Sequence, residues 1–142
     1  MPEKETIERA QRDKREGKAP TTQAGEFIRE EMHHIREGKH GAASTEQAVA
    51  IGLSKARRAG VALPPPKTGS AQTRRQAARD LKRRASKPSA KRARAARKAL
   101  KRQPRAAASK RALARHAKQT ARRRSARARS QSAKRAARTR SR

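Results

Sequence analysis

The sequence predicts an all-α protein with a small two- or three-helix head, followed by a largely disordered or nascent-helical basic tail. The first observation is charge asymmetry: residues 1–66 hold 12 Lys and Arg against 10 Asp and Glu, a net charge of +2. Residues 67–142 hold 30 Lys and Arg against one acid, Asp80, a net charge of +29. The second is that apolar residues at helical spacing are concentrated in the first half, which contains the one aromatic residue, Phe27. Such asymmetry is typical of a polyanion-binding tail on an ordinary head.

The same patterns predict three segments. We expect a helical head at 1–62, whose best-specified part is 21–60, a Pro/Gly/Ser linker at 63–73, and a basic Ala/Arg/Lys-rich tail at 74–142. The linker contains "LPPPKTGS" (63–70), in which the prolines favour an extended backbone and the Gly and Ser favour flexibility. Low hydrophobicity with high net charge leaves the tail too little apolar surface to offset the entropy of ordering.

The first expected helix is "PEKETIERAQRDKREG". Pro2 suits a helix start, acidic residues occupy the first turn, and Gly17 marks a stop. Its apolar content is only Ile7 and Ala10, which indicates a mostly solvated helix.

The second expected helix lies in "TTQAGEFIREEMHHIREGKHG". Thr21 or Thr22 is positioned to cap it, and Gly38 to end it. Glu31 falls within its apolar arc, so we expect that face to be only half buried. The apolar arc consists of Phe27, Ile28, Met32 and Ile35.

The third expected helix follows in "GAASTEQAVAIGLSKARRAG". Ser44 with Gln47 three residues later matches a capping box, and Gly60 fits a Schellman-type stop. Arg57 and Arg58 complement the negative end of the helix dipole, and they also offer a small phosphate contact. The small-residue face, which would allow another helix to approach closely, contains Ala48, Gly52, Ala56 and Ala59.

The tail is rich in Ala and Arg, which are strong helix formers. Its large apolar residues are only Leu81, Leu100 and Leu113, and they define no core face. Like charges three and four residues apart repel in an isolated helix. We therefore expect a tail that is largely disordered until phosphates neutralise it.

The functional prediction is nucleic-acid binding without sequence specificity, with duplex DNA favoured over RNA. Residues 67–142 hold 21 Arg and 9 Lys, and such cations bind phosphates and release condensed counterions. No zinc-finger spacing or aromatic RNA-binding motif occurs, so binding would rest on backbone and shape. The alternatives are an RNA- or ribosome-associated basic protein, or an adaptor whose residues 21–60 self-associate or recruit a protein partner. The expected nucleic-acid-binding residues are Arg57, Arg58, Arg74, Arg75, Arg79, Lys82, Arg83, Arg84, Lys91, Arg92, Arg94, Arg97, Lys98, Lys101, Arg102, Arg105, Lys110, Arg111, Arg115, Arg122, Arg123, Arg124, Arg127, Arg129, Lys134, Arg135, Arg138 and Arg140.

The sequence gives little support for other chemistry. Ser44 with His40 is the one nucleophile–base combination worth naming, and nothing supplies an oxyanion hole, so we expect no enzyme. His33 and His34 diverge by about 100° on a helix, and the chain has no Cys, so we expect neither a metal site nor a cofactor. No apolar run is long enough to span a bilayer and no secretory signal begins the chain, which favours a cytoplasmic, nucleoid location.

Residues 18–63 resemble a small uncharacterised bacterial domain family. The resemblance is carried by "EFIREEMHHIREGKHGAASTEQAVAIGLSKARRAG", above all by "EGKHG" and "AIGLSKARRAG". The tail is similar in composition to the Lys/Arg/Ala-rich tails of bacterial histone-like proteins. The resemblance implies a bacterial or phage origin, and it assigns no functional residue.

Overall fold

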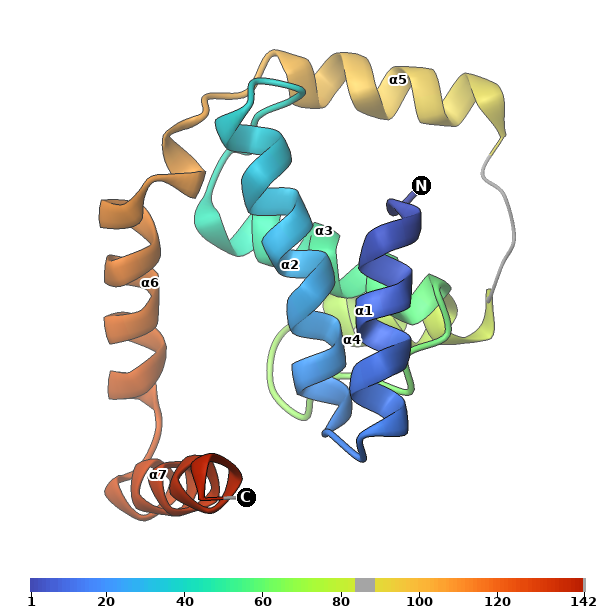
Figure 1. Cartoon of the computed structure of the whole chain (residues 1–142). Helices are drawn as coiled ribbons and strands as arrows, with labels where there is room; N and C mark the ends of the chain where they lie inside the picture. Colours follow the sequence, from blue (N-terminus) through green and yellow to red (C-terminus); the bar gives the residue numbers. More distant parts are fainter. Residues whose placement is uncertain (84–88, 142) are drawn as a thin grey trace. The chain divides into compact units, whose positions relative to one another are not determined.

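A computed structural model describes residues 1–83 and 89–141 of the chain. Within them the chain forms seven α-helices and one 3-10 turn, η1 (Figure 1). The chain divides into two compact units, Met1–Ser109 and Lys110–Arg142. The elements are α1 (Lys4–Arg15), α2 (Pro20–Arg36), α3 (Thr45–Arg58), α4 (Ala71–Lys82), α5 (Ala90–Lys101), η1 (Ala106–Ala108), α6 (Lys110–Arg123) and α7 (Ala126–Arg140).

The prediction of a two- or three-helix head with a disordered tail is wrong, because four further helices, α4 to α7, occupy the basic half. Serines cap three of these helices. The hydroxyl oxygen of Ser70 accepts a hydrogen bond from the Thr73 amide, Ser89 from the Arg92 amide and Ser125 from the Ala128 amide. A serine cap stabilises a helix by about 1 kcal/mol, and Ala and Arg propagate it. Together these local terms outweigh the like-charge repulsion on which the prediction of disorder relied.

The core of the first unit lies among α1, α2 and α3. Helices α1 and α2 form an antiparallel hairpin, and α3 packs against α2 (Figure 1). Gly52 of α3 makes this packing close, since a Cβ there would stand 2.8 Å from the Cα of Ile28. The buried core cluster consists of Ala10, Ala24, Phe27, Ala56, Val61 and Leu63, with Ile7 and Leu53 packed against it.

The start of α2 differs from the prediction that Thr21 or Thr22 caps it. The N-cap residue is Ala19, which makes no side-chain cap, and Pro20 occupies the first turn. A residue before proline is pushed into an extended conformation, and the fixed φ of proline suits the first helical position. Pro20 therefore sets this boundary without a hydroxyl cap.

Helix α3 confirms its predicted ends. The Gln47 amide donates to the Ser44 hydroxyl oxygen at 3.1 Å, and the Gln47 side chain accepts from the Ala43 amide at 2.7 Å. At the other end, the Val61 amide bonds to the Ala56 carbonyl at 3.0 Å, and Gly60 has a φ of +98°. This is the Schellman pattern, which ends the helix at a left-handed glycine.

Within the first unit, two segments of the basic half contact α2, α3 and the loop between them. Helix α4 packs on α3, where Asp80 is buried and accepts hydrogen bonds from Ser54 and Arg58. Residues 100–108 lie against the loop between α2 and α3: the Gly41 amide bonds to the Leu100 carbonyl at 2.9 Å. The compact unit therefore extends well beyond the expected linker.

The docking of residues 100–108 involves three further hydrogen bonds. The Ala42 amide donates to the Pro104 carbonyl, the Thr45 hydroxyl to the Ala107 carbonyl, and the Arg36 side chain to the Ala108 carbonyl. Gly41 permits this contact, because a Cβ there would stand 1.9 Å from the Gln103 carbonyl oxygen.

The second unit contains α6 and α7, neither of which has a buried residue. Arg129 of α7 donates to the Ala121 carbonyl of α6 at 3.4 Å, and Arg124 between them donates to the Ala128 carbonyl at 3.3 Å. Residues 110–141 of this unit form no apolar core, so their order rests on helix propensity and local hydrogen bonds.

Candidate nucleic-acid interface

The structure places the expected nucleic-acid-binding residues in three groups: exposed cations, two arginines used within the fold, and Arg84, which lies outside the described residues. The exposed cations are spread over α4 to α7 and their connections. They are Arg74, Arg75, Arg79, Lys82, Arg83, Lys91, Arg92, Arg94, Arg97, Lys98, Lys101, Arg102, Arg105, Lys110, Arg111, Arg115, Arg122, Arg123, Arg124, Arg127, Arg129, Lys134, Arg135, Arg138 and Arg140.

Arg57 serves the fold and is not presented to solvent. Its guanidinium is buried and donates to the Leu63 and Pro64 carbonyls, each at 3.2 Å. Burial lowers the pKa of Arg57 because the charged form loses hydration, an effect partly opposed by the charge of Asp80. Arg57 thus fastens the segment after α3 and is poorly placed to contact phosphate.

Arg58 lies at the edge of the interface. Its side chain is 42% exposed, and its Nε donates to the Asp80 carboxylate at 3.2 Å. The other partners of this carboxylate are Ser54, at 2.7 Å, and Gln76, at 3.1 Å. The one acid of the basic half is therefore used in docking α4, and it does not neutralise the exposed cations of the later helices.

Helix α5 carries the best-defined cationic surface. Four of its cations and Arg102 at its C-cap recur at helical spacing, which places them within an arc of about 140°. They line one shallow surface hollow, formed by Arg94, Arg97, Lys98, Lys101 and Arg102. A surface of this kind follows directly from the sequence "ARAARKALKR", in which cations and alanines alternate with helical period.

The C-terminal end of α5 is fixed to the head. The Leu100 carbonyl accepts from the Gly41 amide at 2.9 Å, and Pro104 accepts from Ala42 at 3.0 Å. Because both contacts are backbone hydrogen bonds, they leave the nearby side chains of Lys101 and Arg102 exposed. The arrangement presents cations from an anchored helix end, which lowers the entropy lost when they bind a ligand.

The electrostatics of the basic half favour an external anion. Asp80 is the one acid among residues 67–142, so the exposed cations of α5, α6 and α7 have no acidic partner within that half. Cations three and four residues apart repel along each helix. A polyanion that lies along such a helix relieves this repulsion and gains the entropy of counterion release.

No family model matches the chain, and comparison with curated proteins and with solved structures finds no match. In the part of the chain that the structure describes, no helix has the length and apolar character needed to cross a bilayer. The candidate interface is therefore interpreted from its own geometry and charge.

Proposed function

We propose that the protein binds nucleic acid without sequence specificity, and that it acts on duplex DNA as a nucleoid-associated protein. The observation that carries the proposal is the set of exposed cations on α4 to α7, set against one acid that is already occupied at the α3–α4 contact. Binding uses phosphate contacts and not base edges, which is the sequence-independent mode.

The size of α5 supports a duplex ligand. A helix of 12 residues is about 18 Å long, and duplex DNA carries about ten phosphates over that length. The major groove admits an α-helix, and an Arg- and Lys-bearing face reaches the phosphates that border the groove. The tail also contains no aromatic residue on which unpaired bases would stack, which disfavours single strands.

The direct test is binding of the full chain to a fluorescent random-sequence duplex across a range of salt concentrations. We expect tight binding at low salt and a steep loss of affinity as salt rises, about 10³–10⁵-fold between 50 and 200 mM for 6–10 phosphate contacts. A second, unrelated duplex should bind equally well. Absence of binding at 50 mM salt, or binding that does not depend on salt, contradicts the proposal.

Competition separates the duplex DNA proposal from its RNA alternative. A structured RNA and a duplex DNA of equal phosphate number are each used to displace the labelled duplex at fixed salt. We expect the DNA to compete at least as well as the RNA. A strong preference for the RNA would leave nucleic-acid binding intact and would replace the nucleoid role by an RNA- or ribosome-associated one.

A further inference from the structure

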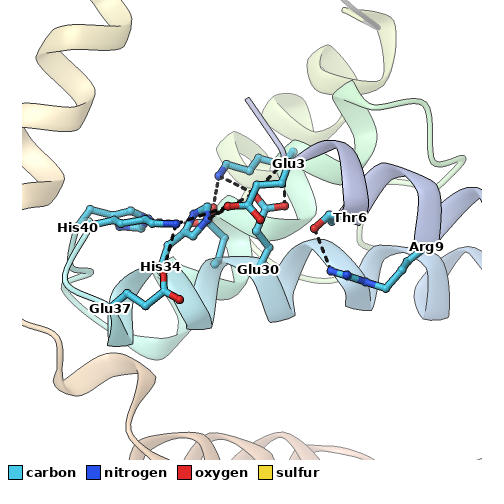
Figure 2. A network of polar contacts seen from close by, with 10 residues as sticks. Glu3, Thr6, Arg9, Glu30, His34, Glu37 and His40 are labelled. Carbon is cyan, nitrogen blue, oxygen red and sulfur yellow. Dashed lines mark hydrogen bonds and ion pairs between the residues drawn. The ribbon is translucent and has the colours of Figure 1, made fainter.

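Three metal-ligating side chains converge where α2 ends. Glu31 and His34 lie about one turn apart on α2, and His40 follows the turn at Gly38, which has a φ of +79°. One ligand atom from each of the three residues lies within 4.8 Å of the others. Figure 2 shows His34 and His40 side by side, with Glu3 and Glu30 reaching the same place from α1's N-terminus and α2.

Glu31 is the anchor of this cluster. Its side chain has 0% exposure, and one carboxylate oxygen contacts the Lys55 ammonium group. The other oxygen, Oε2, is buried without a hydrogen-bond partner. Nε2 of His40 lies 3.1 Å from this oxygen, which is an ion-pair distance, but the contact is not aligned as a hydrogen bond. A buried carboxylate oxygen without a partner is costly unless a cation meets it.

His40 is oriented as a metal ligand would be. Its Nδ1 lies 2.9 Å from the Gly41 carbonyl, and because a carbonyl only accepts, Nδ1 carries the proton. In the neutral ring Nε2 then holds the lone pair, on the side of Glu31. A histidine whose outer nitrogen donates to a backbone carbonyl is the usual arrangement around a bound metal.

His34 is held by a carboxylate. Its Nε2 lies 2.9 Å from Oε1 of Glu3, and the side chain is only 13% exposed. Three carboxylates, from Glu3, Glu30 and Glu31, surround the cluster and face two ammonium groups, from Lys39 and Lys55. Glu37 adds a fourth carboxylate, which pairs with the same Lys39 ammonium group at 3.1 Å, so carboxylates outnumber ammonium groups around the cluster, which suits a divalent cation.

We propose that Glu31, His34 and His40 form a binding site for a divalent transition metal, with Zn²⁺ as the best fit. Two imidazoles and one carboxylate are a donor set that zinc commonly uses. Two ligands of a tetrahedral zinc stand roughly 3.3 Å apart, given bonds of about 2.0–2.1 Å, and the observed separation of His40 Nε2 and Glu31 Oε2 is 3.1 Å. The ion would reach the cluster by the hollow between α1 and α2, which His34 and Glu3 line.

The expectation that the chain has no metal site rests on the adjacent pair His33 and His34. Those two do diverge: His33 is exposed, and His34 is half buried. The fold instead brings His34 together with His40 from across the Gly38 turn, and it adds Glu31 from the preceding turn of α2. The proposed ion thus joins α2 to the loop on which residues 100–108 dock, and its role is structural.

The test titrates the full-length metal-free chain with ZnCl₂ by calorimetry in a buffer that does not chelate. CoCl₂ is used in parallel, because tetrahedral Co²⁺ has intense visible absorption. We expect one ion per chain, a Co²⁺ spectrum of the tetrahedral type that Zn²⁺ abolishes, and a higher Tm with Zn²⁺. His34→Ala and His40→Ala should each weaken Zn²⁺ binding at least about tenfold, whereas the adjacent His33→Ala leaves it unchanged.

If a variant fails to fold, titration of the wild-type chain still decides whether the metal site exists. A chain that binds neither Zn²⁺ nor Co²⁺ at micromolar concentration, and whose Tm does not respond to them, overturns the site. In that case His40 alone meets the buried Glu31 oxygen. Equal losses in His33→Ala and His40→Ala would likewise overturn it, because they would indicate adventitious binding to surface histidines.

Discussion

Ser54 on α3 donates a 2.7 Å hydrogen bond to Asp80 on α4, and so connects the near-neutral half of the chain to the basic half. Asp80 is only 1% exposed, and Arg58 and Gln76 donate to its other oxygen. The one acid among residues 67–142 is therefore explained by the fold. Asp80 holds α4, the first helix of the basic half, against α3.

Asp80→Asn should destabilise the first unit by about 1–3 kcal/mol. The amide keeps the size of the carboxylate but leaves the charge of Arg58 without its partner and weakens the bonds from Ser54 and Gln76. Urea unfolding followed by circular dichroism measures the loss. Glu8→Gln, at an exposed acid that pairs with Lys4 on the same helix, is the matched control and should change stability by less than about 0.5 kcal/mol. Equal stability of Asp80→Asn and wild type would contradict the docking role.

Gly41→Ala should release residues 100–108 from the loop between α2 and α3. A Cβ at Gly41 would stand 1.9 Å from the Gln103 carbonyl oxygen, so the two segments must separate. In the variant, hydrogen exchange should be faster at the backbone amides of positions 41 and 42. Trypsin should also cleave the variant sooner than the wild type after Arg102 and Arg105. Gly25→Ala is the control, because a Cβ there meets nothing within 4 Å inside α2. It should protect the chain slightly, since Ala favours a helix over Gly by about 0.5–1 kcal/mol.

Gly52→Ala tests the close approach of α2 and α3. Helix propensity favours Ala, but its Cβ would stand 2.8 Å from the Cα and 3.0 Å from the amide nitrogen of Ile28. Backbone atoms, unlike a flexible side chain, cannot rotate away from the new Cβ, so α2 and α3 must move apart. We expect this to lower the free energy of unfolding by about 1–3 kcal/mol. Thermal unfolding should show a lower Tm than wild type. A Tm equal to or above that of wild type would mean that α3 packs more loosely than the structure has it.

The head was predictable where local signals were strong. The cap at Ser44 and the stop at Gly60 are read from residues within four positions, and the structure keeps both. The Schellman stop and capping box depend on near neighbours, so no tertiary information was needed. The predicted threonine cap of α2 is wrong because the fixed φ of Pro20 sets the boundary one residue before Thr21.

The helices of the basic half have a local signal in the sequence. Ser70, Ser89 and Ser125 each precede an Ala/Arg-rich run, and each caps a helix. A serine before such a run is a helix start signal as well as part of the composition. The contacts of Asp80 with Ser54 and of Leu100 with Gly41 span 26 and 59 residues. The periodicity of a sequence does not predict contacts between residues so far apart.

The sequence predicts which cations form the candidate nucleic-acid interface, but it does not predict how they are arranged in space. Net charge alone identifies the cations, and all described ones from Arg74 onward are exposed. Charge alone did not separate Arg57, which is buried against the Leu63 and Pro64 carbonyls. Charge also does not predict that His34 and His40 lie close together. They do so because the chain turns at Gly38, between them.

The central claim, that the basic helices bind phosphates, is tested most directly by the salt dependence of duplex binding in two charge-matched variants of the full chain. One variant changes Arg94, Arg97, Lys98 and Lys101 of α5 to Gln; the other changes Lys4, Arg12, Lys14 and Arg15 of α1, which are also exposed. Each loses four positive charges. The α5 variant should lose affinity, and its slope of log K against log salt should fall by about 3–4, whereas the α1 variant keeps a slope near that of wild type. Equal losses of slope and affinity in the two variants would contradict the account, because binding would then follow net charge and not the basic helices.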